Sequence, residues 1–459
     1  MTQPKLLILG AGESGVGAAL LGRQQGWDVL VSDGGLLKDS FRKELQSNDI
    51  AFEEGGHSEQ AFDGVSLVVK SPGIPGTVPA VQRLLQAGVP IVSEIEFAYR
   101  YKGNARIIAI TGSNGKSTTT KLIYHLLRTG GLDASLTGNI GLSLARQIAT
   151  HPTDWYVVEV SSFQLDDIET FRPHIAVVLN ITPDHLDRYN YKIESYAAAK
   201  MRITEVQQPA DYLVLNADDA GLKTAVTAMP VSKAQLLSFS LEQTCTDRVC
   251  ACKEGSQLVV RTSGTSVTVP VRELALKGRH NESNCLAAAT AALLAGVLPE
   301  AVVAGLRDFE GLPHRLETVG MLSGITFIND SKATNVDSVW YALDSMTTPT
   351  ILILGGQDKG NDYSQIRNLV AEKVKAIVCM GVDNAPIHAA FGDLSLPIVD
   401  TDSATAAVDT ALSLAQSGDT VLLSPACASF DLFKNYEDRG TQFRNAVQQT
   451  ILSQTTQPA

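Results

Sequence analysis

The sequence is poor in cysteine, and its few cysteines are badly spaced for metal or redox chemistry. Six occur in 459 residues, and only Cys245, Cys250 and Cys252 lie near one another. One residue separates Cys250 from Cys252, whereas a zinc or redox pair needs two, and no histidine is near enough to complete a site. We therefore expect six reduced thiols with no metal bound to them.

A basic excess and long apolar runs are also missing. The chain has 37 basic and 49 acidic residues, a formal net charge of −12, and nucleic-acid binding without sequence preference needs a basic face. No apolar run approaches the roughly 20 residues that cross a bilayer. The apolar N-terminal run enters a glycine-rich turn without a signal-peptide cleavage pattern. We expect a cytoplasmic protein with neither nucleic-acid nor membrane partners and, at this length, two or three domains.

What the sequence does contain is a phosphate-binding pattern over residues 107–120, IIAITGSNGKSTTT. Four apolar residues predict a buried parallel strand, and a helix is expected to begin at Lys116. The glycines between them let backbone N–H groups and the helix dipole face an anion. Lys116 is expected to reach the terminal phosphates and Ser117 to bind magnesium, although Ile110 stands where the general pattern has glycine. The alternative is an ordinary turn with a solvated lysine.

Three more residues of this middle segment are candidates for the same site. Glu159 lies on a strand predicted over 155–162, near the edge where ligands bind in doubly wound sheets, so it is expected to hold magnesium rather than to lie in solvent. His185 follows a strand predicted over 175–181 and has acidic and arginine neighbours, which favours function and structure about equally. Lys200 lies on a predicted helix among small apolar residues. Burial would lower its pKa, but the pattern alone favours a surface lysine.

The first segment carries a dinucleotide-type fingerprint. Gly10-Ala11-Gly12-Glu13-Ser14-Gly15 lies between a strand and a helix, and the next strand ends at Asp33, which favours a dehydrogenase as one hypothesis. Only about 95 residues precede the phosphate-binding pattern, enough for one mononucleotide-sized half of that fold. A further strand runs into Ser71-Pro72-Gly73. We therefore expect a site for a nucleotide diphosphate carried by the substrate.

The remaining chain continues the α/β pattern. Residues 236–271 alternate apolar and polar with two turn signals, which predicts a short antiparallel subsheet. Asn281 is expected to cap an Ala-rich helix over 285–295, with Asn284 on its first turn. Strands predicted over 325–328, 350–354, 374–380 and 419–424 give a third Rossmann-like domain, and three of them end in polar loops.

Eight segments together resemble one family nearly from end to end: TGSNGKST, EVSSFQL, NITPDHLDRY, AAKMRI, GRHNESN, LPHR, NDSKATN and SPACASFDLFKNYEDRG. The family is that of the Mur ligases, which join amino acids to a UDP-linked muramoyl precursor at the expense of ATP. The segments NDSKATN and SPACAS resemble the branch that adds D-glutamate. The D-N-P-R motif of the branches that add diaminopimelate or lysine is not found. At the glycine-rich turn of the first segment this sequence departs from the family, because Glu13 stands where an apolar residue is expected.

The resemblance implies an α/β fold with three domains. A Rossmann-like domain over 1–95 would bind the UDP substrate. A central P-loop-type ATPase domain over 96–311 would have a mostly parallel sheet and a small antiparallel subsheet. A Rossmann-like domain over 312–459 would bind the amino acid. The substrates would be ATP, UDP-N-acetylmuramoyl-L-alanine and D-glutamate, with two magnesium ions and carbon dioxide bound as a carbamate on Lys200. A monomer is expected.

The resemblance also implies residue roles. Catalysis would involve Lys116, His185, Lys200 and Lys332. The expected ATP contacts are Gly112, Asn114, Gly115, Lys116, Ser117, Thr118, Asn284, Arg315 and Asp330. The expected contacts with the UDP substrate are Ser14, Asp33, Ser71, Gly73, Asn139, His185, Lys332 and Thr334. Magnesium would be held by Ser117, Glu159, His185 and carbamylated Lys200.

The expected D-glutamate contacts are Lys359, Ser429, Phe430 and Tyr436. The amino acid carries two carboxylates, and Lys359 can supply charge to one of them. Ser429 and Phe430 precede a helix that we expect to start at Asp431, so their N–H groups would hold the other; alternatively Ser429 only caps that helix. A folylpolyglutamate synthase, a P-loop kinase and a non-catalytic nucleotide-binding module remain alternative functions.

Overall fold

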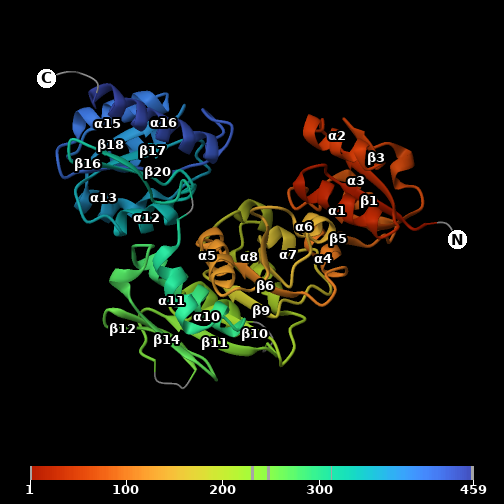
Figure 1. Ribbon diagram of the computed structural model, residues 1–459. Helices are drawn as coiled ribbons and strands as arrows, with labels where there is room; N and C mark the ends of the chain where they lie inside the picture. The colour runs from red at the N-terminus through yellow and green to blue at the C-terminus, as the bar shows by residue number, and fades with distance from the viewer. Residues whose placement is uncertain (1–2, 229–231, 246–248, 312, 456–459) are drawn as a thin grey trace. The chain divides into compact units, whose positions relative to one another are not determined.

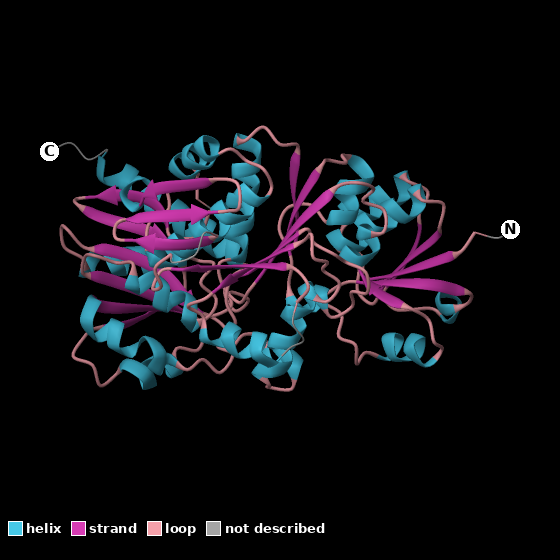
Figure 2. Cartoon of the chain, turned by 90° about the horizontal axis from the view of Figure 1, so that it is seen from below, coloured by secondary structure: helices cyan, strands magenta, loops and turns pink. Residues whose placement is uncertain are grey.

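The computed structural model describes residues 3–228, 232–245, 249–311 and 313–455. Residue 312, the predicted start of the third domain, lies outside the described residues. Three separate β-sheets follow one another along the chain, each covered by helices (Figures 1 and 2). The first two sheets belong to one compact unit and the third belongs to a second unit. The three-domain α/β fold expected from the sequence is confirmed.

The first sheet has five parallel strands in the order β3-β2-β1-β4-β5, which is the doubly wound order 3-2-1-4-5-6 without the sixth strand. It is therefore larger than the three-strand, mononucleotide-sized half expected from the sequence. Its strands are β1 (Lys5–Leu9), β2 (Asp28–Asp33), β3 (Ala51–Glu54), β4 (Val65–Lys70) and β5 (Ile91–Ser93). Helices α1 (Glu13–Gln24), α2 (Asp39–Ser47) and α4 (Glu94–Tyr99) pack on one face, and η1 (Glu59–Phe62) and α3 (Pro79–Gln86) pack on the other. Helices cover both faces of this sheet, so the strand residues that point to either face are mostly apolar.

The central sheet has nine strands in the order β14-β13-β12-β11-β10-β9-β6-β8-β7. Six parallel strands form its main part: β6 (Arg106–Thr111), β7 (Ala134–Gly138), β8 (Trp155–Glu159), β9 (Ile175–Val178), β10 (Tyr212–Asn216) and β11 (Gln235–Ser240). Strands β12 (Cys250–Glu254), β13 (Gln257–Arg261) and β14 (Ser266–Pro270) extend it as an antiparallel subsheet. The subsheet predicted over 236–271 is confirmed for this part only, because its first segment forms the parallel strand β11.

Helical segments connect and cover these nine strands. They are α5 (Lys116–Thr129), α6 (Leu144–Thr150), α7 (Ser162–Leu165), η2 (Leu186–Tyr189), α8 (Ile193–Met201), η3 (Arg202–Thr204), α9 (Ala220–Ala228), η4 (Val271–Glu273), α10 (Arg279–Leu294) and α11 (Pro299–Asp308). The helix after the phosphate-binding pattern begins at Lys116, as predicted. Helix α10 begins earlier than predicted, so Asn281 and Asn284 lie within it and neither residue is its cap.

Cys245 and Cys252 form a disulfide, so the expectation of six reduced thiols is wrong for this pair. Their two Cα atoms lie 5.7 Å apart, within the range that a disulfide spans. The spacing of the cysteines in the sequence did not reveal this approach. The remaining four cysteines are free thiols.

The third sheet has six strands in the order β15-β16-β20-β17-β18-β19. They are β15 (Glu317–Leu322), β16 (Ile325–Asn329), β17 (Thr350–Gly355), β18 (Val374–Met380), β19 (Ile398–Thr401) and β20 (Thr420–Ala426), and only β15 runs antiparallel. Helices α12 (Val336–Asp344), α13 (Arg367–Lys373), α14 (Ala385–Phe391) and η5 (Tyr363–Ile366) cover one face, and α15 (Ala404–Leu414) and α16 (Tyr436–Thr455) cover the other.

The helix expected to start at Asp431 is not formed. Residues 431–435 form turns, and α16 begins at Tyr436. Asn435 lies directly before the helix, and its side-chain oxygen accepts a hydrogen bond from Asp438 N at 2.7 Å. This contact explains the later start, because an asparagine that accepts such a bond competes well for the N-cap position. The expectation that Ser429 caps this helix or lies at its dipole is therefore wrong.

Candidate functional site

The phosphate-binding loop lies at the carboxyl end of β6, between that strand and α5. Gly112 has φ +153° and Gly115 has φ +82°, backbone conformations that favour glycine. A Cβ atom at Gly115 would lie 2.6 Å from Asn284 Oδ1. The fold therefore brings α10 against the loop and places Asn284, predicted to contact ATP, beside it.

Residues after β9 hold this loop, and the sequence analysis did not single them out. Asn180 Oδ1 accepts from Asn114 N at 2.7 Å, and Asn180 Nδ2 donates to Asn114 O at 3.0 Å. Ser113 Oγ donates to Thr182 O at 2.8 Å and accepts from Thr182 N at 2.9 Å. These reciprocal bonds fix the loop before any ligand arrives. The available signal was an asparagine near the end of the apolar strand predicted over 175–181; the observed strand ends at Val178, before Asn180.

The first turn of α5 supplies the cation and the hydroxyls of the pattern. Lys116 Nζ donates to Gly112 O at 2.7 Å and to Ser113 O at 2.8 Å, so its charge lies over the loop. Ser117 and Thr118 are buried, and Thr118 Oγ1 has no hydrogen-bond partner within the described part of the chain. Such a buried hydroxyl is suited to a ligand that brings its own polar groups.

Glu159 fits a metal ligand. It ends β8 and pairs in register with Ile110 of β6, so the adjacent strand delivers it to the start of the loop. Its Oε1 accepts a hydrogen bond from Asn139 Nδ2 at 2.9 Å, whereas its buried Oε2 has no partner among the described residues. An orphaned carboxylate oxygen is costly unless a cation or donor satisfies it. The alternative of an exposed edge-strand glutamate is wrong, because Glu159 is 1% exposed.

Lys200 is also buried at this loop, against the surface position that the pattern favoured. It is 1% exposed, and its Nζ donates to Gly112 O at 2.9 Å. Burial, and next the charge of Lys116, hold the pKa of Lys200 well below its usual range, although Asp184 and Glu159 act in the opposite direction. Helix α8 packs this face inward, which the short run of alanines could not reveal. This shift favours the neutral form of the amine.

His185 lies at the rim of the same region. Its φ of +51° is left-handed, and its side chain is about half exposed. Nε2 lies 3.6 Å from Asp184 Oδ2, and the ring packs edge-to-face on Phe163 at 5.3 Å between centroids. The charge of Asp184 also acts on Lys200, so the two predicted metal residues share an acidic neighbour.

A pocket of about 650 Å³ opens at the carboxyl ends of the strands of the first sheet. It is lined by four predicted UDP-substrate residues, Ser14, Asp33, Ser71 and Gly73, and also by His57. Asp33 Oδ2 accepts from Ala11 N at 2.6 Å, and Oδ1 accepts from Gly35 N at 2.8 Å. The fingerprint aspartate thus orders both turns that border the pocket.

Two acidic residues, Glu13 and the buried Glu94, join the first two domains. Glu13, at the unexpected fingerprint position, accepts from Arg146 Nε at 2.7 Å and from Ser143 N at 3.1 Å. Glu94, at the start of the linking helix α4, accepts from Ala145 N at 2.5 Å. The departure at Glu13 is therefore explained by a contact with the central domain.

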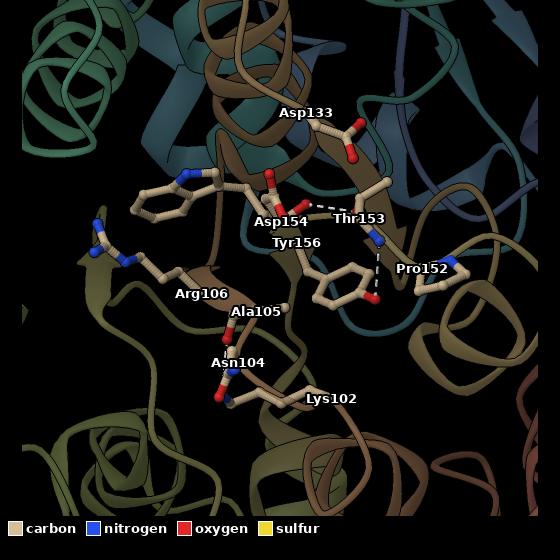
Figure 3. Close-up of a pocket in the computed structure, with 10 residues that line it drawn as sticks. Lys102, Asn104, Ala105, Arg106, Asp133, Pro152, Thr153, Asp154 and Tyr156 are labelled. Atoms are coloured by element: carbon tan, nitrogen blue, oxygen red, sulfur yellow. Dashed lines mark hydrogen bonds between the residues drawn. The ribbon is translucent and has the colours of Figure 1, made fainter.

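A separate pocket of about 520 Å³ lies at the amino ends of β6, β7 and β8 (Figure 3). Arg106 lies over the Trp155 ring at 5.4 Å, and Thr153 N donates to Tyr156 Oη at 3.3 Å. The phosphate loop is at the opposite ends of these strands, so this pocket is not part of the candidate active site.

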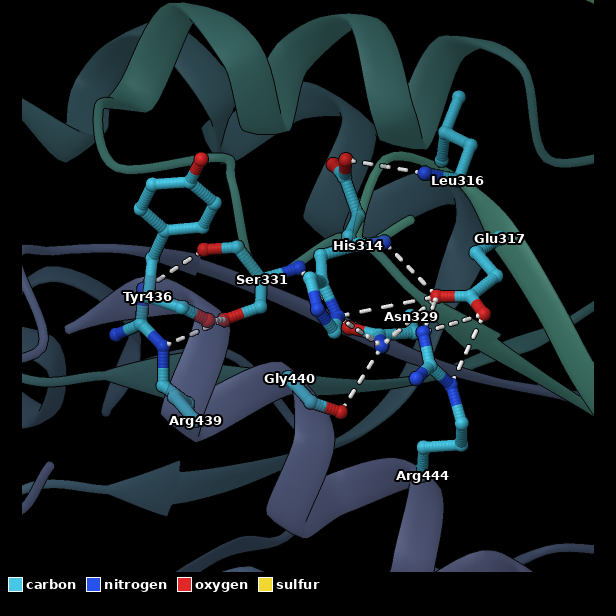
Figure 4. A network of polar contacts seen from close by, with 10 residues as sticks. His314, Leu316, Glu317, Asn329, Ser331, Tyr436, Arg439, Gly440 and Arg444 are labelled. Atoms are coloured by element: carbon cyan, nitrogen blue, oxygen red, sulfur yellow. Dashed lines mark hydrogen bonds and ion pairs between the residues drawn. The ribbon is translucent and has the colours of Figure 1, made fainter. Parts of the chain in front are cut away.

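In the second unit, a polar network surrounds the end of β16 (Figure 4). Asp330 accepts from Ser424 Oγ at 3.0 Å and from Leu316 N at 3.2 Å, and burial raises its pKa to about 7 despite the nearby charge of Arg315. Lys332 Nζ donates to Tyr436 Oη at 3.2 Å. The predicted ATP residues Arg315 and Asp330 are thus adjacent, as are the predicted substrate residues Lys332 and Tyr436.

A fully buried arginine at the start of α16 ties three strand-end loops of this sheet together. Arg439 Nη2 donates to Ser331 O at 2.9 Å, and both Nη atoms donate to Cys427 O at 3.1 Å. Its Nη1 also reaches Gly355 O at 3.5 Å. These carbonyls follow or end β16, β20 and β17. Arg439 was given no role from the sequence, although it lies in the segment SPACASFDLFKNYEDRG that carries the family resemblance.

The predicted D-glutamate residues lie on two of these loops. Lys359 is exposed in the loop after β17, Ser429 is buried, and Phe430 is 67% exposed after β20. Gln357 N donates to Ala428 O at 2.8 Å, which joins the two loops. No described helix of the chain is long and apolar enough to cross a membrane.

Family models match the three domains in order. They are the Mur ligase MurD-like N-terminal domain over 4–93, the Mur ligase middle domain over 110–292 and the Mur ligase glutamate ligase domain over 314–427. Together with the phosphate loop, these matches define a ligase of the Mur type. The chain belongs to the Mur ligase family.

Two curated relatives carry the name UDP-N-acetylmuramoylalanine–D-glutamate ligase. That of Cytophaga hutchinsonii is 50% identical over 96% of this chain and 98% of its own length. That of Porphyromonas gingivalis is 49% identical over the same shares of the two chains. Among solved structures, a pseudomurein peptide ligase type C from Methanothermus fervidus has a TM-score of 0.62 at 20% identity, covering 98% of this chain and 100% of its own. UDP-N-acetylmuramate–alanine ligase from Thermotoga maritima has a TM-score of 0.60 at 17% identity, covering 97% and 99%.

Proposed function

We propose that this chain is an ATP-dependent amide ligase that adds D-glutamate to UDP-N-acetylmuramoyl-L-alanine in peptidoglycan precursor synthesis. The names of relatives at about half identity over nearly the full length support this substrate pair. The observation in the fold that supports the chemistry is the buried group at the phosphate loop, where Lys116, Lys200 and the orphaned oxygen of Glu159 converge.

The reaction balances in two steps. A substrate carboxylate oxygen attacks the γ-phosphorus of ATP. The bond between that phosphorus and the oxygen of the ADP leaving group breaks, and an acyl phosphate forms. The amine of D-glutamate then attacks the acyl carbon through a tetrahedral intermediate, phosphate leaves with the carboxylate oxygen, and the amine loses a proton. Two anions meet in the first step, so positive charge must be held near the loop. Lys116 supplies it from this chain.

Magnesium, when bound, neutralises the phosphates and stabilises the developing charge. Glu159 would hold one ion together with Ser117, because its Oε2 is buried and has no partner among the described residues. Asn139 keeps the other carboxylate oxygen occupied, which orients the free one. His185 with modified Lys200 would hold the second ion.

Lys200 is suited to carbamylation. A neutral amine adds to carbon dioxide and releases one proton, giving an anionic oxygen ligand where a buried cation would otherwise repel magnesium. The lowered pKa of Lys200 supplies that neutral amine. Labelling the protein with carbon-13 bicarbonate should give a carbamate resonance that is lost in Lys200→Ala. An unmodified amine in active enzyme would exclude the modification.

The pocket of the first domain is suited to the nucleotide diphosphate of the substrate. Asp33 and the glycine-rich turn line it at the carboxyl ends of the strands, which is where doubly wound sheets bind nucleotides. UDP should compete with the UDP substrate, and NADH should give no saturable signal. Saturable NADH binding would favour the dehydrogenase hypothesis.

The function itself is tested by phosphate release from ATP. With UDP-N-acetylmuramoyl-L-alanine present, we expect release to depend on D-glutamate and not on L-alanine, D-glutamine or a diamino acid. Equal turnover with a folate acceptor would favour the folylpolyglutamate synthase alternative, and release that needs no amino acid would favour a kinase or simple ATPase.

A further inference from the structure

A group of three metal-binding side chains lies outside every site described above. Cys379 on β18, His388 on α14 and Asp400 on β19 each present one donor atom, and the three atoms lie within 4.8 Å of one another. In the register of the two parallel strands, Cys379 is paired directly with Asp400. Their side chains therefore leave the sheet on the same face, which is the face that α14 covers.

The contacts within the group are already those of a polar cluster. His388 Nε2 lies 3.0 Å from Asp400 Oδ1 and 3.2 Å from Oδ2. The Cys379 thiol donates to the Asp400 carboxylate, and Thr401 Oγ1 donates to Cys379 O at 2.8 Å, which fixes the strand backbone. Burial and the Asp400 charge raise the pKa of the thiol to about 12. The thiol thus keeps its proton until a cation displaces it.

The surroundings differ on the two sides of the group. Cys379 is fully buried, whereas the side chains of His388 and Asp400 are 43% and 56% exposed. His388 and Asp400 also line a cavity of about 830 Å³ at the carboxyl ends of β18 and β19. Cys379 is held in place, and the exposed His388 and Asp400 side chains can rotate toward it. A metal ion could therefore be coordinated by all three. The cavity leaves room for a water molecule as a fourth ligand.

We propose that Cys379, His388 and Asp400 form a zinc site with one coordination position open to this cavity. Thiolate, imidazole and carboxylate are all zinc ligands, and three protein ligands with a water are typical of an open zinc site. In a tetrahedral site with bonds of about 2.0–2.3 Å, the donor atoms lie roughly 3.4 Å apart. The exposed His388 and Asp400 side chains have to move by about an ångström or so to reach that spacing. Binding releases the thiol proton to solvent.

The other group of this kind in the described part of the chain contains Cys245, Cys252 and Glu254. Its two sulfurs are joined in the disulfide, so it cannot supply thiolates unless that bond is reduced. This difference allows the two groups to be separated by experiment. It also requires that no thiol reductant be present during the measurement.

The test is a titration of the full chain with cobalt(II), the spectroscopic substitute for zinc, without added nucleotide or thiol. A thiolate ligand gives a sulfur-to-cobalt charge-transfer band, which oxygen ligands at the phosphate loop cannot give. We expect the band to appear at one equivalent per chain, to be lost in Cys379→Ser and His388→Gln, and to vanish when zinc is added. Cys250→Ser is the matched control and should keep the band, because Cys250 is a free thiol outside both groups.

Zinc alone should also raise the melting temperature of the wild type, because a ligand that binds only the folded state stabilises it. His388→Gln and Asp400→Asn change exposed side chains, so they test the site even if Cys379→Ser folds poorly. Each should weaken zinc binding by at least about tenfold. The proposal is overturned if no charge-transfer band forms, or if the band persists in both Cys379→Ser and His388→Gln. It is independent of the ligase function.

Discussion

At the scale of single residues, the chemistry depends on a few buried charges at the phosphate loop. Lys200 and Glu159 are each 1% exposed, and such groups persist only when partners or ligands satisfy them. Their positions are what an ATP-dependent ligase requires, because charge must be neutralised at one point while water is kept away.

Lys116→Ala should abolish ligation while leaving binding of the UDP substrate nearly intact. A positioned cation at the transferring phosphate is worth several kcal/mol, so turnover should fall roughly a hundredfold or more. Lys121→Ala, on the same helix, is the matched control. The measurement is phosphate release alongside equilibrium binding of UDP, and wild-type turnover in Lys116→Ala would remove the loop from the mechanism.

Lys359→Ala should raise the KM for D-glutamate and leave that for the UDP substrate little changed. Loss of a charge-assisted hydrogen bond costs about 1.5–3 kcal/mol, so the effect should be about tenfold or more. Lys375→Ala is the control, because Lys375 pairs with Asp419 at the amino end of β18. An unchanged KM for D-glutamate would show that Lys359 is not a substrate contact.

At this scale, the sequence predicted Lys116, because it follows a strand and a glycine-rich turn. It also predicted the acids Asp33 and Glu159, because each ends an apolar strand. It could not predict the burial of Lys200, because that depends on how α8 packs. It was wrong about Ser429, because Asn435 starts the next helix and this competition between caps is decided by backbone geometry. It missed Arg439, whose partners are carbonyl groups that no pattern marks.

At the scale of elements, hydrogen bonds between strand ends and helix starts stabilise each of the two units. Arg439 joins the loops after three strands, and Glu94 joins α4 to the start of α6. In the third sheet, edge strands β15 and β19 were not predicted, whereas the four strands between them were, because edge strands are shorter or only partly buried and give weaker apolar patterns.

Arg439→Lys should raise the KM for D-glutamate by about tenfold, with a smaller change in KM for the UDP substrate. Lysine keeps the charge but cannot reach several carbonyls in one plane, so the loops lose their common anchor. Arg444→Lys is the matched control, because Arg444 lies on the same helix and pairs with Glu317 instead (Figure 4). If both variants lose stability alike and neither shifts KM, Arg439 is only a packing residue.

Glu94 should make stability depend on pH. Burial raises its pKa to about 7 from 4.5, so the folded state binds the proton more tightly than the unfolded state does. This contribution is complete below about pH 4.5 and is lost as the pH rises toward 7. The maximum is about 3 kcal/mol, from 1.36 kcal/mol per pKa unit.

The corresponding variant is Glu94→Gln, which cannot ionise. Between pH 5 and pH 7, the free energy of unfolding of the wild type should fall by about 2 kcal/mol relative to this variant. Glu96→Gln is the control of opposite sign, because hydrogen bonds hold the pKa of Glu96 below its usual value despite burial. Denaturant titrations at several pH values measure both. A constant difference between the wild type and Glu94→Gln would show that Glu94 is ionised in the folded protein.

At the scale of the whole molecule, we propose that the three domains divide the binding of the nucleotide-carrying substrate, ATP and the amino acid among their three sheets. The order of the three domains was predictable from the motifs, because each motif follows a strand of its own sheet. The joining of the first two into one unit was not, since it depends on contacts such as Glu13 with Arg146 that lie far apart in the sequence. The exact domain boundaries stay predictions.

The central claim is that the substrate carboxylate is activated by phosphorylation. It is tested most directly with both oxygens of that carboxylate labelled with oxygen-18 and the complete mixture of ATP, magnesium and D-glutamate. One oxygen leaves with the phosphate and the other stays in the new amide, so the account predicts one label in each inorganic phosphate released. Phosphate without label, formed at the same rate as the amide product, would contradict it.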